Sequence, residues 1–254
     1  MGGMARRATL IDSIRETHSG SLLVVDAGNT LMGTALSLQN QGRAVLEGLD
    51  QMGYDALGVG TGEVLKGLEV LLQRASEADL AIVSANLVYR DTQEPVLQPY
   101  VTIERQATRY AVIGISATPL LQGLEATWPG VTVLPADQVL AEYVEAVRNQ
   151  VDVVVVLSQL GLDADLALAE AVDGIDVVVG GGTQVLLEQP RIVGNTAIVQ
   201  VGYDGEWLGQ LEFAPDSQGR NEATYEVLYM RGDVPEAPQM NELLHRYRAE
   251  ATIE

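Results

Sequence analysis

The first 180 residues alternate between apolar strand patterns and amphipathic helix patterns. Runs of apolar residues predict buried strands at 21–26, 55–59, 78–84, 151–157 and 175–180. Amphipathic spacing predicts helices at 5–16, 42–52, 63–73, 136–149 and 163–172. Strands that are apolar along their whole length are typical of sheets covered by helices on both sides. This part of the chain therefore predicts β-α units with the sheet inside and the helices outside.

The pattern changes after Gly181. Short strands at 191–193, 196–202, 207–213 and 224–229 are separated by turn residues and predict an antiparallel meander. Strands at 100–104 and 110–115 are expected to pair, and a closing helix is expected at about 241–249. We predict one domain over 1–254, with two mixed sheets packed face to face between helical layers. This is a four-layer α/β/β/α sandwich.

Charge and composition narrow the function. The formal net charge is −20 and the sequence pI is about 4.3, which argues against nucleic acid and anionic membrane surfaces as partners. The charge has two explanations: it keeps the protein soluble, or it attracts a basic protein partner. The absence of cysteine excludes thiol chemistry and is compatible with the periplasm. No apolar run is long enough to span a membrane, and residues 1–10 lack the apolar centre of a signal peptide.

Chemistry is expected where the strands end, because ligands of α/β sheets gather beyond the carboxyl ends of the strands. The segments at these ends are AGNT after 21–26, GTGE after 55–59, SQLG after 151–157 and GGTQ after 175–180.

These segments resemble the 5′-nucleotidase branch of the calcineurin-like metallophosphoesterases over about residues 2–214. VVDAGNTLMGTALS is similar to the family pattern D-A-G-D-T-x-x-G-T-x-x-S, and MGYDALGVGTGE to G-Y-D-A-x-x-x-G-N-H-E. LSQLG and VDGIDVVVGGGTQ are similar to L-S-H-L-G and G-I-D-x-I-x-G-G-H-S-H. VSANL and VQVGYDGEWLGQL match further segments in the same order. The resemblance implies the four-layer fold and hydrolysis of phosphate esters with two metal ions.

The departures from the family fall on its metal ligands. The resemblance places six altered residues at those positions: Asn29, Thr61, Gly62, Gln159, Gly182 and Gln184. Two-metal hydrolysis requires a bridging carboxylate and several imidazoles, and the chain contains only His18 and His245. We therefore predict a catalytically degenerate domain without catalytic residues, metal or cofactor, which acts in binding or assembly. The alternative is an active phosphoesterase or 5′-nucleotidase with a Mn, Zn or Fe pair, completed by segments outside this chain.

Several residues near the strand ends can be interpreted in two ways, as a ligand site or as part of the structure. The glycine-rich segment 58–63 is either a phosphate cradle or a turn inherited from the G-N-H-E loop. Asn29, Gln159 and Gln184 either form a polar cluster that binds a small molecule or an ion, or have no ligand. Gly180, Gly181 and Gly182 are expected to be a flexible turn. Asp26 is expected to be structural, and Glu63 to lie at a helix N-terminus.

The family resemblance also shapes the expected partners. The family's first strand would precede residue 2, and its nucleoside-binding C-terminal domain would follow this chain. Without the first strand, the edge of the strand at 21–26 is expected to be open to strand addition. We expect a second copy or another extracytoplasmic protein as the partner, and a periplasmic or extracellular location with the signal outside this chain.

Overall fold

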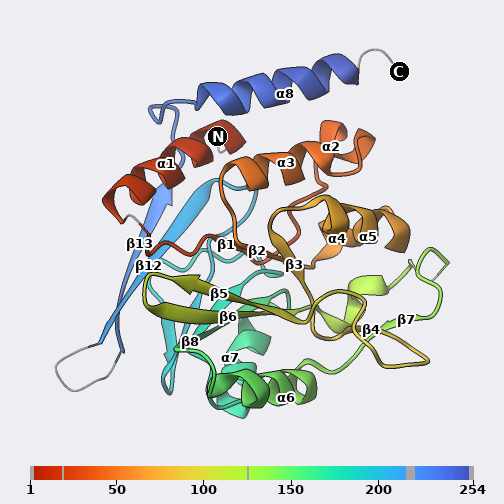
Figure 1. The fold of residues 1–254 in the computed structure, drawn as a ribbon, viewed down its shortest axis with the longest axis vertical. Helices are drawn as coiled ribbons and strands as arrows, with labels where there is room; N and C mark the ends of the chain where they lie inside the picture. Colours follow the sequence, from red (N-terminus) through yellow and green to blue (C-terminus); the bar gives the residue numbers. More distant parts are fainter. Residues whose placement is uncertain (1–2, 19, 125, 216–220, 252–254) are drawn as a thin grey trace.

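The computed structural model describes residues 3–18, 20–124, 126–215 and 221–251, and it has the predicted layer order of helices, sheet, sheet and helices (Figure 1). The expectation of a four-layer α/β/β/α sandwich with mixed sheets is therefore confirmed.

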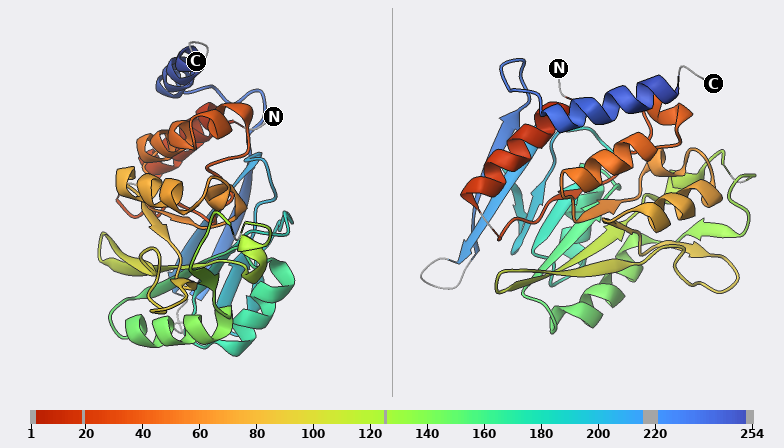
Figure 2. Two further views of the ribbon diagram at one scale, coloured as in Figure 1. Left: turned by 90° about the vertical axis from the view of Figure 1, so that its right-hand side faces the viewer. Right: turned by 45° about the horizontal axis from the view of Figure 1, so that its top comes forward.

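The first helical layer is formed largely by the N-terminal third of the chain. It contains α1 (Met4–Thr17), α2 (Ala35–Gln39), α3 (Arg43–Gln51), α4 (Thr61–Val64) and α5 (Leu68–Glu77). Helix α8 (Pro238–Glu250) lies outside this layer, over α1 and α3 (Figure 2). Leu31, Leu49, Leu57 and Leu71 are fully buried beneath these helices.

Two sheets form the centre of the molecule. The first contains the parallel strands β1 (Val25–Asp26), β2 (Ala56–Gly58) and β3 (Ala81–Val83). The second has the order β10-β11-β9-β8-β6-β5. Its strands are β5 (Tyr100–Arg105), β6 (Thr108–Ile115), β8 (Val153–Ser158), β9 (Val177–Gly180), β10 (Arg191–Val193) and β11 (Thr196–Val199). Its outer pairs are antiparallel and its inner pairs parallel, so it is mixed.

Helices α6 (Ala136–Arg148) and α7 (Leu162–Ala171) form the last layer. Both cover the outer face of the six-stranded sheet (Figure 1). Leu140 and Val144 of α6 and Leu168 of α7 pack on this face, which is built from fully buried valines such as Val154 and Val156. The central strands β8 and β9 are covered on both faces, which explains their continuous apolar runs in the sequence.

The predicted meander is wrong. Strand β10 pairs with β11, but β11 then pairs in parallel with β9. Strands β12 (Trp207–Pro215) and β13 (Asn221–Tyr229) form a separate antiparallel hairpin. The cause is that β11 is apolar on both faces and is buried inside the large sheet, which alternation over short strands did not indicate. The small pair β4 (Leu87–Tyr89) and β7 (Val131–Val133) and the 3-10 helix η1 (Thr118–Leu121) were also not predicted.

The predicted strand 21–26 is shorter than expected, since only Val25 and Asp26 pair with β2. Among the described strands, none pairs with the other edge of β1. The preceding residues are held instead by side chains: Arg105 Nε donates to the Leu22 carbonyl at 3.1 Å, and Asp55 accepts from the Val24 N–H at 2.8 Å. None of the described helices has the length and apolar character needed to cross a bilayer.

Candidate functional site

The loops that follow β1, β2, β8 and β9 meet at one edge of the two sheets. The β1 loop contains Asn29, which adopts a left-handed backbone conformation (φ 65°) that Asn tolerates better than most residues. Its Oδ1 accepts a hydrogen bond of 2.8 Å from the N–H of Gly62 in the β2 loop. Gln159 in the β8 loop donates from Nε2 to the carbonyl of Ala27 at 3.0 Å. These bonds connect three of the four loops.

Glu63 is the main connection between the β1 and β2 loops. Its side chain is fully buried, and its two oxygens accept from four backbone N–H groups. Oε1 accepts from Thr30 and Leu31, and Oε2 from Asn29 and Gly60, at 2.7–2.9 Å. Burial raises the pKa of Glu63, and the four N–H donors act in the opposite direction. The prediction of a helix N-terminal charge was therefore incomplete, because Glu63 also holds the neighbouring loop.

Gln159 fills the space between the loops. It is 8% exposed, and a Cβ added at Gly60 would lie 2.7 Å from its Oε1. A Cβ at Gly181 would overlap its Nε2. Gly182 has φ +81°, and a Cβ there would lie 2.7 Å from the Gln159 carbonyl oxygen. The glycines around Gln159 are therefore needed for close approach, and the backbone leaves little room for larger side chains at Gly60, Gly181 and Gly182.

The structure thus brings together four of the six predicted site positions: Asn29, Gly62, Gln159 and Gly182. Thr61 and Gln184 lie at the same edge with exposed side chains. Gln184 has a left-handed backbone (φ 57°) on the exposed turn after β9. Asn29 and Gln159 are accordingly partners of the backbone, and Gln184 does not complete a cluster with them.

The phosphate-cradle interpretation of residues 58–63 is not supported. A phosphate would need free N–H groups in this loop. The Gly60 N–H already donates to Glu63, and the Gly62 N–H donates to Asn29. The Glu63 N–H donates to the Gly60 carbonyl, so these three donors of the loop are used within the protein.

Asp26 is structural, as expected. Its Oδ1 accepts from the N–H of Gly28 and from the hydroxyl of Thr30, both at 2.9 Å. Its Oδ2 lies 3.9 Å from Arg7 Nη1. Both oxygens are therefore directed to partners within the protein rather than to a cation.

The residues present do not fit a pair of divalent cations. No group of three or more His, Cys, Asp or Glu residues suited to a metal ion occurs in the described part of the chain. The amide oxygen of Asn29 is already an acceptor, and the carboxylates of Asp26 and Glu63 are held by backbone donors. His18 contacts Glu212 at 3.1 Å, away from these loops, and His245 lies on α8. Within the described residues, these four loops therefore present neither a bridging carboxylate nor an imidazole to a metal pair.

Sequence reasoning missed Asp165 in the first turn of α7, beside the end of β8. Its side chain is fully buried and accepts from the hydroxyl of Ser158, while Oδ2 has no hydrogen-bond partner. Burial raises the pKa of Asp165 to about 6, against the opposing effect of the Ser158 hydrogen bond. The only signal in the sequence is an acidic residue seven positions after Ser158 at a helix start, which is usually an exposed N-terminal charge.

Comparison with known proteins identifies phosphoesterases as relatives of this chain. No protein-family model matches the chain. It is 26% identical to the trifunctional nucleotide phosphoesterase protein YfkN of Bacillus subtilis, over 97% of this chain and 20% of that protein. It is 32% identical to a snake venom 5′-nucleotidase of Gloydius brevicauda, over 86% of this chain and 41% of that protein. The chain spans less than half the length of these curated relatives.

Solved structures of related proteins share the fold of this chain. The sulfate thiohydrolase SoxB of Thermus thermophilus has a TM-score of 0.91 at 27% identity, covering 98% of this chain and 47% of that chain. A 5′-nucleotidase precursor, also from Thermus thermophilus, has a TM-score of 0.89 at 27% identity, covering 99% and 54%. The calcineurin-like phosphoesterase YfkN of Bacillus subtilis, at 20% identity and a TM-score of 0.83, shares the fold over 98% and 89%.

The fold is therefore that of a metallophosphoesterase-type domain, with the four loops at the edge of its two sheets. The homologues of the chain are 5′-nucleotidases and the calcineurin-like phosphoesterase YfkN, and the chain matches the N-terminal domain of this family.

Proposed function

We propose that this domain is a non-catalytic relative of the 5′-nucleotidases that acts by binding another protein. One observation carries the proposal. At the edge where the family pattern places metal ligands, Asn29, Gln159 and Glu63 use their polar groups to hold the loops to one another. A site built for two cations would direct these atoms into an open space.

The chemistry of the substituted residues supports the same proposal. Amide oxygens such as those of Asn29 and Gln159 are neutral and balance none of the charge of two divalent ions. Glycine at positions 62 and 182 contributes no side-chain ligand. The close packing at Gly182 makes a return to histidine there sterically costly.

The intact core is the second support. Val154, Val156, Leu157 and Val178 are fully buried in the six-stranded sheet. A domain without a role would be expected to collect polar substitutions in such strands, each costing roughly 1–3 kcal/mol when left unsatisfied. The maintained core suggests a continuing role in association, with a second copy or with another protein as the partner.

We also propose that the domain works in the periplasm or outside the cell. A relative that is 32% identical is a venom protein, and venom is a secreted fluid. The chain has no cysteine, which is compatible with an oxidising compartment.

The proposal predicts background hydrolysis. The purified protein, supplied with manganese, zinc or iron, should hydrolyse neither AMP nor a generic phosphodiester above a no-protein control. The matched positive control is a related 5′-nucleotidase assayed in parallel. Turnover that co-purifies with the protein and disappears with a chelator would overturn the proposal and support the active phosphoesterase.

A further inference from the structure

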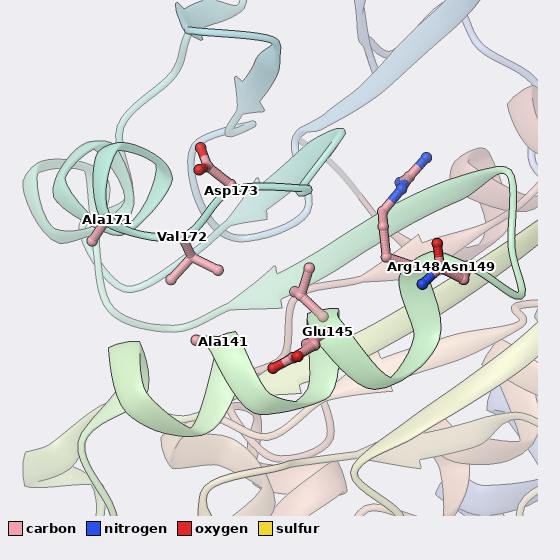
Figure 3. Close-up of a pocket in the computed structure, with 8 residues that line it drawn as sticks. Ala141, Glu145, Arg148, Asn149, Ala171, Val172 and Asp173 are labelled. Carbon is pink, nitrogen blue, oxygen red and sulfur yellow. The ribbon is translucent and has the colours of Figure 1, made fainter.

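A hollow of about 310 Å³ lies between the C-terminal ends of α6 and α7 (Figure 3). Buried Val144 and Val172 line its inner part, and Ala141 and Ala171 form its walls. The polar groups at its rim come from Glu145, Asn149, Asp173 and Arg148. An apolar floor with a polar rim suits a long amphipathic side chain, whose stem packs on the floor while its head group stays at the rim.

The hollow lies at the opposite end of the sheet from the four loops. Helix α6 leads into the start of β8 and α7 into the start of β9, whereas Gln159 and Gly182 follow the ends of those strands. An occupant of the hollow would therefore leave these loops uncovered. The two regions can be tested separately.

The charge of the hollow favours a cation. The C-terminus of each helix carries about half a negative charge, and both helices end here. Glu145 and Asp173 are exposed and add two carboxylates from opposite sides (Figure 3).

Arg148 does not cancel this charge. It pairs with Asp176, donates to the Asp152 carbonyl at 2.9 Å, and extends away from Glu145 (Figure 3). Its charge is therefore already matched by a carboxylate outside the hollow.

The protein surface around the hollow is also negatively charged. Between Tyr110 and Pro190 the sequence contains 11 Asp and Glu residues, and Arg148 is its single Lys or Arg. Arginines are concentrated on the opposite outer face, in α1 and α8. The net charge of −20 is thus distributed unevenly, and the face formed by α6 and α7 attracts positive groups from solution.

We propose that this hollow is a docking site for a basic segment of a partner protein. A Lys or Arg side chain places its methylene stem on Val144 and Val172 and its head group between Glu145 and Asp173. The inference rests on the proposed binding role, and it names the surface and the chemistry of the partner. Charge complementarity and the apolar floor together select a Lys- or Arg-bearing polypeptide rather than a purely apolar one.

The test uses a short amphipathic peptide of Lys, Leu and Ala, with a Glu-for-Lys peptide as its control. Titration of the isotope-labelled protein should shift the NMR signals of Ala141, Glu145, Asn149 and Asp173, and the control peptide should not. The double variant Glu145→Gln/Asp173→Asn should weaken binding by at least about fivefold, because close charge pairs contribute strongly to affinity.

A matched double variant, Glu69→Gln/Asp79→Asn, removes the same charge from exposed positions near α5 and should change binding less than about twofold, because distant charges are screened. Ala171→Trp fills the hollow without changing charge and should also abolish binding. Ala164→Trp, exposed on α7 but outside the hollow, is its control. Circular dichroism confirms that each variant is folded.

Equal weakening by both double variants, or shifts spread over the whole acidic surface, would overturn the docking site. Failure of the Lys peptide to bind the protein would also overturn the docking site. Self-association that is lost in Glu145→Gln/Asp173→Asn would assign the hollow to a second copy and also overturn the proposal. None of these outcomes changes the hydrolysis assay, so failure of the docking site and failure of the non-catalytic role remain distinguishable.

Discussion

Replacing Glu63 with Gln should lower the free energy of unfolding by about 2–4 kcal/mol. The carboxylate accepts from four backbone N–H groups, two on each oxygen. Gln keeps one acceptor oxygen, and its NH₂ group then faces two N–H donors that have lost their acceptor, one of them buried. The expected loss is measured by urea unfolding followed by circular dichroism.

Glu69→Gln is the matched control, since Glu69 is exposed on α5. The control should leave the unfolding midpoint nearly unchanged. A Glu63→Gln protein as stable as the wild type would show that Glu63 does not hold the loops. The interpretation that the polar side chains at the four loops hold these loops together would then lose its main support.

Replacing Asp165 with Asn should change how stability depends on pH. The pKa of Asp165 in the folded protein is about 6, above the 3.8 of the unfolded chain. Between these values the folded state holds a proton that the unfolded state has released, so stability falls as pH rises through this window. Asn cannot titrate, so the variant should gain about 2–3 kcal/mol relative to the wild type between about pH 4 and about pH 7.5.

The measurement is the difference between variant and wild type at each pH, which cancels the titration of all other groups. Asp163→Asn, exposed in the same helical turn, is the control for removing one carboxylate from this part of α7. A difference for Asp165→Asn that stays flat, or that changes in the opposite direction, would contradict the assignment of a raised pKa to this buried carboxyl.

The layer order of the fold could be predicted because the spacing of apolar residues in the sequence indicates which faces of helices and strands are buried. The apolar runs at 151–157 and 175–180 became β8 and β9 within a residue or two. The failures have physical causes. The helix predicted over 63–73 is divided into α4, which ends at Val64, and α5, which begins after Gly67, whose φ of +92° is not helical. The meander failed because partner choice between strands depends on tertiary packing, which periodicity does not report.

The candidate site was only partly accessible from the sequence. The resemblance drew attention to six positions, and the structure shows four of them, Asn29, Gly62, Gln159 and Gly182, near one another. The contact of Glu63 with the neighbouring loop and the burial of Asp165 could not be predicted. A single acidic residue at a helix start gives no indication of burial or of the backbone groups that another loop presents to it. Such roles depend on contacts between segments far apart in the chain.

Metal content of the purified protein tests the central claim most directly. Elemental analysis after incubation with manganese, zinc and iron, followed by dialysis, should find no transition metal retained in proportion to protein. The reason is that the side chains of Asn29, Gln159 and Glu63 are hydrogen-bonded to the backbone of neighbouring loops. Retention of two equivalents of metal per chain, lost on treatment with a chelator, would contradict the account and indicate a working two-metal site.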